Sequence, residues 1–406
     1  MPTKLPVARN TLLLSAGMAA LYGMVQLWAA VTPITFEAVT GLEGLVGLGP
    51  AIFMSTAALA ALPAGRAMDR LGRVPVLAGG FALGILGCVL AGFGASLLSV
   101  VAVVFGLVFI GASYGSVMLS RAAAADMYLP ERRARGIALV LFGAVFGALL
   151  GPFVFVPLFA QEGAQGGQLM APWLVAAGFM VVGLVLVLNV RPDPKRIGAL
   201  LAERSGERID RSPETAAPLV QILRRPGVLA ALLAAVASFS VMASMMTLSG
   251  YVLVGHGHHQ GAVFPVLSAH FIGMFGLMLI VGSIIDRVGR LRALAGGLLL
   301  IGFCTISVVW AVESIAATSL ALFGIGLGWN FSYVAATAEL SDRTVPVERG
   351  KILGFTDMLA GLLSAVLASL GGLTLAAVGL AGLGAVGLAL TAAPMLFVLR
   401  GMSKRA

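Results

Sequence analysis

Long apolar stretches alternate with short polar turns along the whole of this chain of 406 residues. A helix of about 20 residues crosses the ~30 Å hydrocarbon core of a bilayer, because each residue rises by about 1.5 Å. The pattern therefore predicts an all-α protein with twelve transmembrane helices, each satisfying its own backbone hydrogen bonds. The expected spans are 11–34, 44–66, 75–95, 98–121, 135–158, 171–190, 228–252, 264–285, 292–312, 315–339, 351–374 and 377–399.

One extended polar segment, Arg191 to Arg225, interrupts this pattern in the middle of the chain. It combines several prolines with charges of both signs, and we expect one amphipathic helix in it around Arg196–Arg211. The segment predicts two six-helix bundles, at 1–190 and 227–406, joined by a cytoplasmic linker at 191–226.

Charge excludes a soluble protein and sets the orientation of the helices. Only 11% of the residues are charged, against about 25% in soluble domains. All 26 Lys and Arg residues fall in the two tails, the linker and alternate turns, so the positive-inside rule predicts a multi-pass protein of the inner or plasma membrane with both termini cytoplasmic. The net charge of +9 is therefore a topology signal, and we expect no nucleic-acid partner.

A charged turn occurs in both halves of the chain with the pattern G-x-x-x-D-R-x-G-R. The copies are Gly65–Arg73 and Gly282–Arg290, and each is followed two helices later by an aspartate and a proline, at Asp126 and Asp342. Two halves repeated in parallel are typical of secondary transporters. With these motifs, the chain resembles the major facilitator superfamily over its whole length, and within it bacterial proton-coupled exporters. The resemblance implies two bundles that rock around a central substrate site.

The resemblance also implies a conformational latch at the cytoplasmic face, built from the repeated turns. The alternative is that these charges only fix the topology, but basic residues alone would do so, and we favour the latch. A glycine in each turn is expected to admit a neighbouring helix closely. The latch residues are Gly65, Asp69, Arg70, Gly72, Arg73 and Asp126 in the first half, and Gly282, Asp286, Arg287, Gly289, Arg290 and Asp342 in the second.

The fifth predicted helix carries small residues at every fourth position and then a proline, at Gly143, Gly147, Gly151 and Pro152. Such a stripe lets two helices pack closely, and the proline kinks the helix. The stripe resembles the motif of proton-coupled exporters in the same helix, although the segment that follows, Phe153–Pro157, departs from that motif. Generic helix packing is the alternative interpretation.

Charged side chains inside the predicted spans are candidates for function, because each is costly in a bilayer. Asp357 is expected to carry protons or bind a cation; pairing with Arg121 or helix capping is the alternative. Glu339 is expected at the inner interface beside Asp342. Arg121 is expected to extend to the cytoplasmic surface, whereas an Arg121 that faces the cavity would indicate an anionic substrate.

Histidines and outer carboxylates supply two further candidates for proton coupling, His270 and Glu37. His270 lies inside the eighth helix, where a proton relay and a packed core histidine are both open. Glu37 would line the outer vestibule if the first helix is longer than marked. Loop polarity explains the remaining histidines, at 256, 258 and 259, better than a metal site does, and no metal is expected.

Polar, aromatic and methionine residues near the middle of the helices are candidates for the substrate cavity. Asn330 is notable because a buried amide needs a partner. The candidates are Tyr22, Gln26, Tyr114, Arg121, Met242, Met245, Trp329, Asn330 and Tyr333.

Together these features predict a secondary transporter and not an enzyme. Proton-coupled efflux of a hydrophobic or cationic compound is the first hypothesis, and proton-linked uptake of a polar or anionic metabolite is the second. A transport-inactive scaffold is the third, and the two latches argue against it. The chain carries no G-x-x-x-x-G-K-[ST] loop for ATP, and its two cysteines, Cys88 and Cys304, lie in apolar runs. We expect a monomer without a cofactor whose partners are its substrate, protons and the lipid bilayer.

Overall fold

The computed structural model describes residues 5–129, 132–159, 170–205 and 217–403, and every regular element in these ranges is a helix. The elements are α1 (Val7–Thr40), η1 (Glu43–Leu45), α2 (Leu48–Leu71), α3 (Arg73–Ser96), α4 (Val100–Val117), α5 (Ser120–Asp126), α6 (Arg133–Phe155), η3 (Val156–Phe159), α7 (Met170–Leu188), α8 (Pro194–Ser205), α9 (Leu219–Leu223), α10 (Val228–Gly255), η5 (Gln260–Ala262), α11 (Val263–Phe275), α12 (Val281–Val288), α13 (Arg290–Ala311), α14 (Ile315–Asp342) and α15 (Pro346–Ser403).

Within the described ranges, ten helical segments are long and apolar enough to cross a bilayer. They coincide with the predicted apolar stretches, with two differences. The predicted span 264–285 is divided between α11 and α12, and the two predicted spans after residue 350 form one helix, α15, of 58 residues. The chain is thus an all-helical, multi-pass membrane protein, while the count of twelve crossings stays a prediction.

A glycine explains one of the two places where the apolar pattern and the helices diverge. In α15 the backbone leaves helical geometry at Gly379, with φ 76° and ψ −170°, which is a region that favours glycine. Helix α11 ends before Gly276, and a turn of five residues separates it from α12. Both sites lie inside continuous apolar sequence, so hydrophobic pattern alone does not reveal them.

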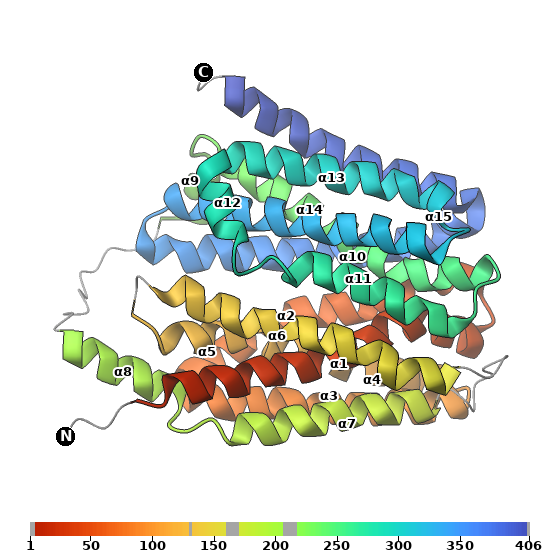
Figure 1. Cartoon of the computed structure of the whole chain (residues 1–406), viewed down its shortest axis with the longest axis horizontal. Coiled ribbons are helices and arrows are strands. Elements are labelled where there is room, and N and C mark those ends of the chain that lie inside the picture. The colour runs from red at the N-terminus through yellow and green to blue at the C-terminus, as the bar shows by residue number, and fades with distance from the viewer. Residues whose placement is uncertain (1–4, 130–131, 160–169, 206–216, 404–406) are drawn as a thin grey trace.

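The helices gather into two groups that face each other (Figure 1). In the first group α1 packs against α6 and α7, and α3 packs against α4 and α7; in the second, α10 packs against α14 and α15, and α13 packs against the same two helices. The groups meet where α2 contacts α15, α6 contacts α11 and α1 contacts α10. We call them the N-bundle (α1–α7) and the C-bundle (α10–α15); the predicted domain boundaries stay a prediction.

Helix α1 begins and α15 ends at the same end of the molecule, where α8 and α9 also lie (Figure 1, left). We call this the linker end. At the opposite end the bundles are tightly packed: a Cβ added to Gly47 would overlap the carbonyl oxygen of Ala368, and one added to Gly372 would lie 2.8 Å from the backbone nitrogen of Gly47. Side chains larger than glycine would therefore separate the bundles there.

Candidate functional site

An ion pair joins the two bundles in the interior of the structure. Nη2 of Arg121 in α5 donates to Oδ2 of Asp357 in α15 at 2.7 Å, and the hydroxyl of Tyr333 in α14 donates to Oδ1 of the same carboxylate. Asp357 lies about 16 Å along α15 from its first residue, Pro346. The side chains are 36% and 35% exposed. Because a charge that faces lipid is costly, the pair faces the space between the bundles.

Arg121 binds the carboxylate on α15 and keeps about a third of its side chain exposed, and its extension to the cytoplasmic surface stays a prediction. Helix α4 ends at Val117, and α5 begins at Ser120 after a short turn. The pairing that was the alternative for Asp357 is present in the structure. Whether Asp357 also carries protons stays a prediction.

Aromatic residues lie beside this ion pair. The ring of Tyr333 stacks on Trp329 one helical turn away, with centroids 5.2 Å apart and an angle of 24° between the planes. On the N-bundle, the hydroxyls of Tyr22 and Tyr114 are 3.4 Å apart. Tyr114 and Tyr333 are partly exposed, whereas Tyr22 and Trp329 are buried. Of the predicted cavity residues, those with exposed surface are therefore Tyr114, Tyr333 and Arg121.

The other cavity candidates are buried, and of these Met245 lines cavities between α10 and α15. Gln26 connects the bundles, because its Nε2 donates to the carbonyl of Ala148 at 2.9 Å and to Oγ of Ser268 at 2.8 Å. Asn330 is completely buried, and neither Oδ1 nor Nδ2 has a partner among the described residues. The two methionines, Met242 and Met245, are buried in α10.

His270 is buried at the contact of α11 with α14. Its Nδ1 forms a hydrogen bond of 2.8 Å with the carbonyl of Leu322, and its Nε2 has no partner in the described part of the chain. This contact agrees with a packed core histidine, and the proton-relay role stays a prediction.

Glu37 lies at the end opposite the linker, where it contacts the C-bundle. The first helix extends to Thr40, so Glu37 is inside it, as the vestibule interpretation required. The hydroxyl of Tyr251 in α10 donates to Oε1 of Glu37 at 3.3 Å. This hydrogen bond and the close packing at Gly47 keep the bundles together at that end. Tyr251 was not predicted from the sequence, since an isolated tyrosine near a helix end has no distinguishing pattern.

The first repeated turn forms a compact charged cluster within the N-bundle. Arg73 binds Oδ1 of Asp69 at 2.9 Å and Oδ2 of Asp126 at 2.6 Å. Gly72 joins α2 to α3 with φ +100°, and the backbone nitrogens of Arg73 and Val74 both donate to Oδ2 of Asp193 at 2.9 Å. The carboxylate of Asp193 thereby occupies the N-terminus of α3, where the helix dipole favours negative charge.

The second turn forms the matching pair between Arg290 and Asp342 in the C-bundle. Gly289 has φ +94°, close to the φ of +100° at Gly72, its counterpart in the first turn. The side chains of Asp286 and Arg287 are exposed, as that of Arg70 is. A Cβ added to Gly65 or Gly282 would meet no atom within 4 Å. The close helix approach expected at these glycines is therefore not made in this conformation, and the latch stays a prediction.

The linker is attached to both bundles. Asp193 and Lys195 hold its first part to the N-bundle, since Nζ of Lys195 donates to the carbonyl of Asp69 at 2.5 Å. The helix predicted around Arg196–Arg211 corresponds to α8, at Pro194–Ser205, and residues 206–211 of the prediction lie outside the described part of the chain. The motif Pro-Asp-Pro signals a helix start, and Asp193 indeed accepts from the nitrogen of Lys195, but no local pattern indicates that it also caps α3.

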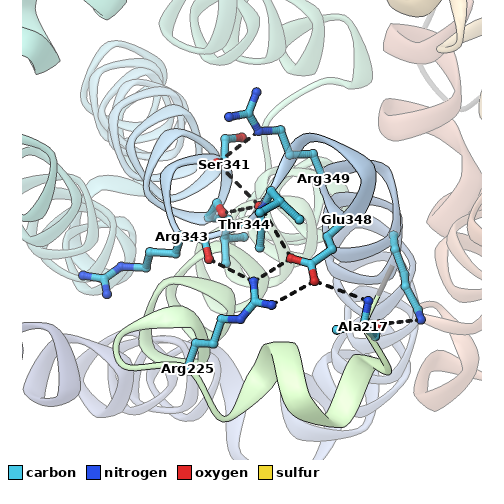
Figure 2. Close-up of polar contacts among 10 residues, drawn as sticks. Ala217, Arg225, Ser341, Arg343, Thr344, Glu348 and Arg349 are labelled. Carbon is cyan, nitrogen blue, oxygen red and sulfur yellow. Dashed lines mark hydrogen bonds and ion pairs between the residues drawn. The ribbon is translucent and has the colours of Figure 1, made fainter. Parts of the chain in front are cut away.

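The last part of the linker binds a buried carboxylate of the C-bundle, as Figure 2 shows. Glu348, only 2% exposed, accepts from both Nη atoms of Arg225 at 2.5 and 2.8 Å, and from the backbone nitrogens of Ala217 and Val345 at 3.3 Å. Hydrogen bonding to Glu348 raises the pKa of the Arg225 guanidinium above its usual value.

Two further charged residues of the C-bundle pair next to this site. Oε1 of Glu339 binds Arg343 one turn along α14, at 2.5 Å, near the inner end of the helix where a carboxylate was expected. Glu348 itself was missed, because a Glu in a polar turn gives no sign that the linker will bury it.

The glycine stripe of α6 packs against α1. A Cβ added to Gly143 or Gly147 would overlap the carbonyl oxygens of Ser15 or Ala19, and one added to Gly151 would overlap the side chain of Gln26. Pro152 lies inside the same helix. The stripe therefore serves close packing within the N-bundle, and its association with export stays a prediction.

Two of the three histidines at 256, 258 and 259 are bound to backbone carbonyls. Nδ1 of His256 pairs with Val252 at 2.8 Å, and Nε2 of His258 pairs with Val312 at 2.9 Å. Within the described ranges, no three histidine, cysteine or acidic side chains gather as metal ligands.

The fold and the ion pair between the bundles define the class, a multi-pass membrane protein built around a central polar site. The sequence model of the Major Facilitator Superfamily matches residues 11–369, and the chain belongs to this family. An uncharacterized MFS-type transporter of Bacillus subtilis, YddS, is 28% identical over 337 residues, which cover 82% of this chain and 77% of YddS. The riboflavin transporter RfnT of Brucella anthropi is 29% identical over 320 residues, which cover 78% and 76%.

Solved structures share the fold. The xylose transporter XylE from E. coli, in a partially occluded inward-open conformation, has a TM-score of 0.74 at 14% identity, covering 98% of this chain and 99% of that one. The human organic anion transporter MFSD10 has a TM-score of 0.69 at 18% identity, covering 97% and 100%.

Proposed function

We propose that this protein is a proton-coupled secondary transporter that carries a small molecule across the inner or plasma membrane by alternating access. Its family supports transport as the class of activity. The observation that carries the coupling is the ion pair between Arg121 and Asp357, because it connects the two bundles through a group that can bind a proton.

The ion pair couples the charge of Asp357 to the relative movement of the two bundles for an electrostatic reason. A change in the angle between the bundles moves α5 relative to α15 and separates the two charges. Separation without compensation leaves two partly buried ions without their partners, at a cost of about 1–2 kcal/mol because each side chain is about a third exposed. A proton on Asp357 removes one of these charges, and a polar or anionic group of the substrate can then replace the carboxylate on Arg121. Proton and substrate therefore favour the same rearrangement.

We propose that this conformation opens toward the linker end. Contacts of Glu37 and Gly47 close the opposite end, while about a third of the surface of Arg121 and of Asp357 is accessible. We propose that the linker end is cytoplasmic, with both termini there, and that the two bundles rock as separate domains in a monomer.

The latch belongs to the other conformation in this proposal. In the conformation of the structure, Arg73 pairs with carboxylates of its own bundle. A Cβ added to Gly65 or Gly282 would meet no atom within 4 Å. When the bundles close at the linker end, the helices of the opposite bundle would approach these glycines and engage Asp69 and Asp286.

Proton-linked uptake fits the ion pair better than export does. An arginine in the central site repels a cationic substrate and attracts an anionic or polar one, so the second hypothesis gains weight. The relative RfnT is named for riboflavin, a polar compound with a flat ring system, and we propose riboflavin as the first compound to test.

Export of a hydrophobic compound is the second candidate function. The buried aromatic residues beside the ion pair favour it, because they suit an apolar ligand. In this alternative Asp357 releases its proton to the cytoplasm while the compound leaves. The direction of proton flow relative to substrate separates the two candidates.

Proteoliposomes with an imposed pH gradient test the proposal. Riboflavin uptake should rise when the outside is acidic, fall when a protonophore is added, and lose its dependence on the gradient in Asp357→Asn. Glu313→Gln, at an exposed carboxylate in an outer turn, is the matched control and should behave as the wild type does. Uptake that is equally sensitive to the gradient in Asp357→Asn would refute the assignment of Asp357.

A further inference from the structure

Six aromatic side chains form a continuous series of ring contacts from one bundle to the other. We call this series the aromatic belt: Tyr22, Tyr114, Phe239, Phe275, Trp329 and Tyr333. Tyr22 of α1 lies at the crossing point, with its centroid 6.5 Å from that of Tyr114 and 4.9 Å from that of Phe275. Phe275 continues to Trp329 at 5.9 Å, and Trp329 stacks on Tyr333 at 5.2 Å.

One end of the belt lies at the ion pair, because Tyr333 donates its hydroxyl hydrogen to Asp357. The other end is Tyr114 of α4, in the N-bundle, which also carries Arg121. Tyr114 and Tyr333 are partly exposed, whereas the crossing point at Tyr22 is only 2% exposed. The accessible surface of the two tyrosines therefore lies at the two ends of the belt.

Polar atoms of the belt lack good partners inside the protein. The indole nitrogen of Trp329 has no hydrogen-bond partner among the described residues, although the side chain is only 7% exposed. The hydroxyls of Tyr22 and Tyr114 are 3.4 Å apart, longer than the roughly 2.5–3.0 Å of a good O–H···O bond. The indole nitrogens of Trp28 and Trp173 are unpaired in the described ranges as well, and what distinguishes Trp329 is its place against Tyr333, which binds Asp357. A ligand with acceptor atoms at this position would satisfy the N–H of Trp329.

Packing alone does not account for this arrangement. Leucine and phenylalanine fill the interior of a membrane protein without a polar atom to satisfy. Three of the five tyrosines in the chain are nevertheless in the belt, together with a buried tryptophan whose N–H is unpaired. Flat faces with polar edges suit a flat ligand with polar edges, since aromatic rings stack and the N–H and O–H groups donate to the ligand's rim.

We infer that the substrate carries a flat aromatic ring system that binds against Trp329 and Tyr333 on one side and Tyr114 on the other. A hydrogen-bond-accepting or anionic edge of the same molecule would bind Arg121. This inference rests on the proposed function, because it assigns the chemical class of the substrate at the same central site. It requires no covalent step.

A pair of ligands that differ only in aromaticity tests the inference. 2-Naphthoate and decahydro-2-naphthoate have the same charge and carbon skeleton, but the second lacks the flat π system. Their affinities are measured by titration calorimetry on the full chain in lipid nanodiscs. We expect 2-naphthoate to bind about tenfold or more tightly than its saturated counterpart, as stacking energies of aromatic ligands indicate. Equal binding of the two, or no binding of either, would overturn the inference.

Substitutions of belt residues test where the ring of 2-naphthoate binds. Trp329→Ala should weaken 2-naphthoate binding about tenfold, whereas Trp329→Phe, which keeps a ring and preserves folding, should retain most of it. Trp310→Ala is the control, because Trp310 is 74% exposed on α13 and outside the belt. Tyr114→Leu offers a second disruption, on the other bundle. Unchanged affinity in both Trp329→Ala and Tyr114→Leu would place the ring elsewhere and contradict the inference.

The test is independent of proton coupling. If 2-naphthoate binds more tightly than decahydro-2-naphthoate but transport in proteoliposomes does not depend on the pH gradient, the inferred substrate class is supported and the proposed proton coupling is refuted. If transport depends on the gradient but the two ligands bind with equal affinity, proton coupling is supported and the aromatic substrate class is refuted. The neutral 2-naphthamide separates the roles further, because it keeps the ring and removes the charge that would bind Arg121.

Discussion

Arg121 and Asp357 are 236 positions apart in the sequence and belong to opposite bundles, and their charged groups meet at 2.7 Å. With Tyr333 they form a contact that cannot stay unchanged when the bundles move relative to each other. The carboxylate is the titratable member, and Arg121 and Tyr333 are the groups that bind it.

Removal of either charge should destabilise the protein more than removal of both. Arg121→Gln or Asp357→Asn leaves one partly buried ion without its partner, whereas the double variant leaves none. Because each side chain is about a third exposed, we expect a coupling of about 1–2 kcal/mol and not the larger value of a dry pair. Thermal unfolding in nanodiscs measures it. Strictly additive effects of the two substitutions would show that the residues do not interact.

The glycine stripe of α6 should tolerate no side chain. Gly147→Ala places a methyl group against the carbonyl oxygen of Ala19, and overpacking of this kind costs about 1–3 kcal/mol. Gly178→Ala is the matched control in α7, where an added Cβ meets no atom within 4 Å. The midpoint of thermal unfolding should fall for the first variant and stay constant or rise for the second. A stable Gly147→Ala variant would mean that α1 and α6 are not as close as described.

The buried carboxylate of Glu348 should hold the end of the linker to the C-bundle. Glu348→Gln removes the charge that binds Arg225, and we expect faster cleavage by trypsin after Arg224 as the segment detaches. Glu203→Gln, at an exposed position of α8, is the control. A cleavage rate that Glu348→Gln leaves unchanged would show that other contacts hold the segment.

The hydrogen bond between Tyr251 and Glu37 should favour closure of the end opposite the linker. Tyr251→Phe removes this bond, worth about 0.5–1.5 kcal/mol, so the population open at that end should rise by up to about tenfold. Spin labels at the exposed positions Leu42 and Gly255 report the distance between the bundles at that end by double electron–electron resonance. Tyr128→Phe is the control, because it removes a hydrogen bond to Thr11 within the N-bundle. The same distance distribution in Tyr251→Phe and in the wild type would exclude a gating role.

The apolar pattern was sufficient to locate the membrane helices but not their interruptions. Each predicted stretch is helical in the described part of the chain, because a bilayer requires internally bonded backbone. The breaks before Ser120 and after Phe275 lie within apolar sequence. Hydrophobicity is the same on either side of such a break, so it carries no signal of one.

The central site was predicted only in part, because hydrophobicity does not reveal which side of a membrane helix faces the interior of the protein. Asp357 and Arg121 were identifiable as costly charges inside helices, and their pairing was among the alternatives. The sequence left the partner of Arg121 open, because Asp357 is 236 positions away and only the packing of the two bundles brings the charges together. Lipid and protein interior are both apolar, so the sequence does not reveal that Gln26 and Met242 are enclosed while Tyr114 is accessible.

The central claim is that the charge state of Asp357 controls the relative position of the bundles. Spin labels at Arg66 and Ser283, which are both exposed near the linker end, one in each half, report this separation without knowledge of the substrate. Cys88 and Cys304 are buried, which limits background labelling.

Distance distributions are compared at about pH 5 and about pH 8, so that the proton concentration is the only variable that changes. The wild-type protein should shift its distribution between the two, and Asp357→Asn should hold the acid distribution at both, while His270→Gln and Glu37→Gln retain the shift. A wild-type protein that does not respond to pH, or an Asp357→Asn variant that responds as the wild type does, would contradict the claim.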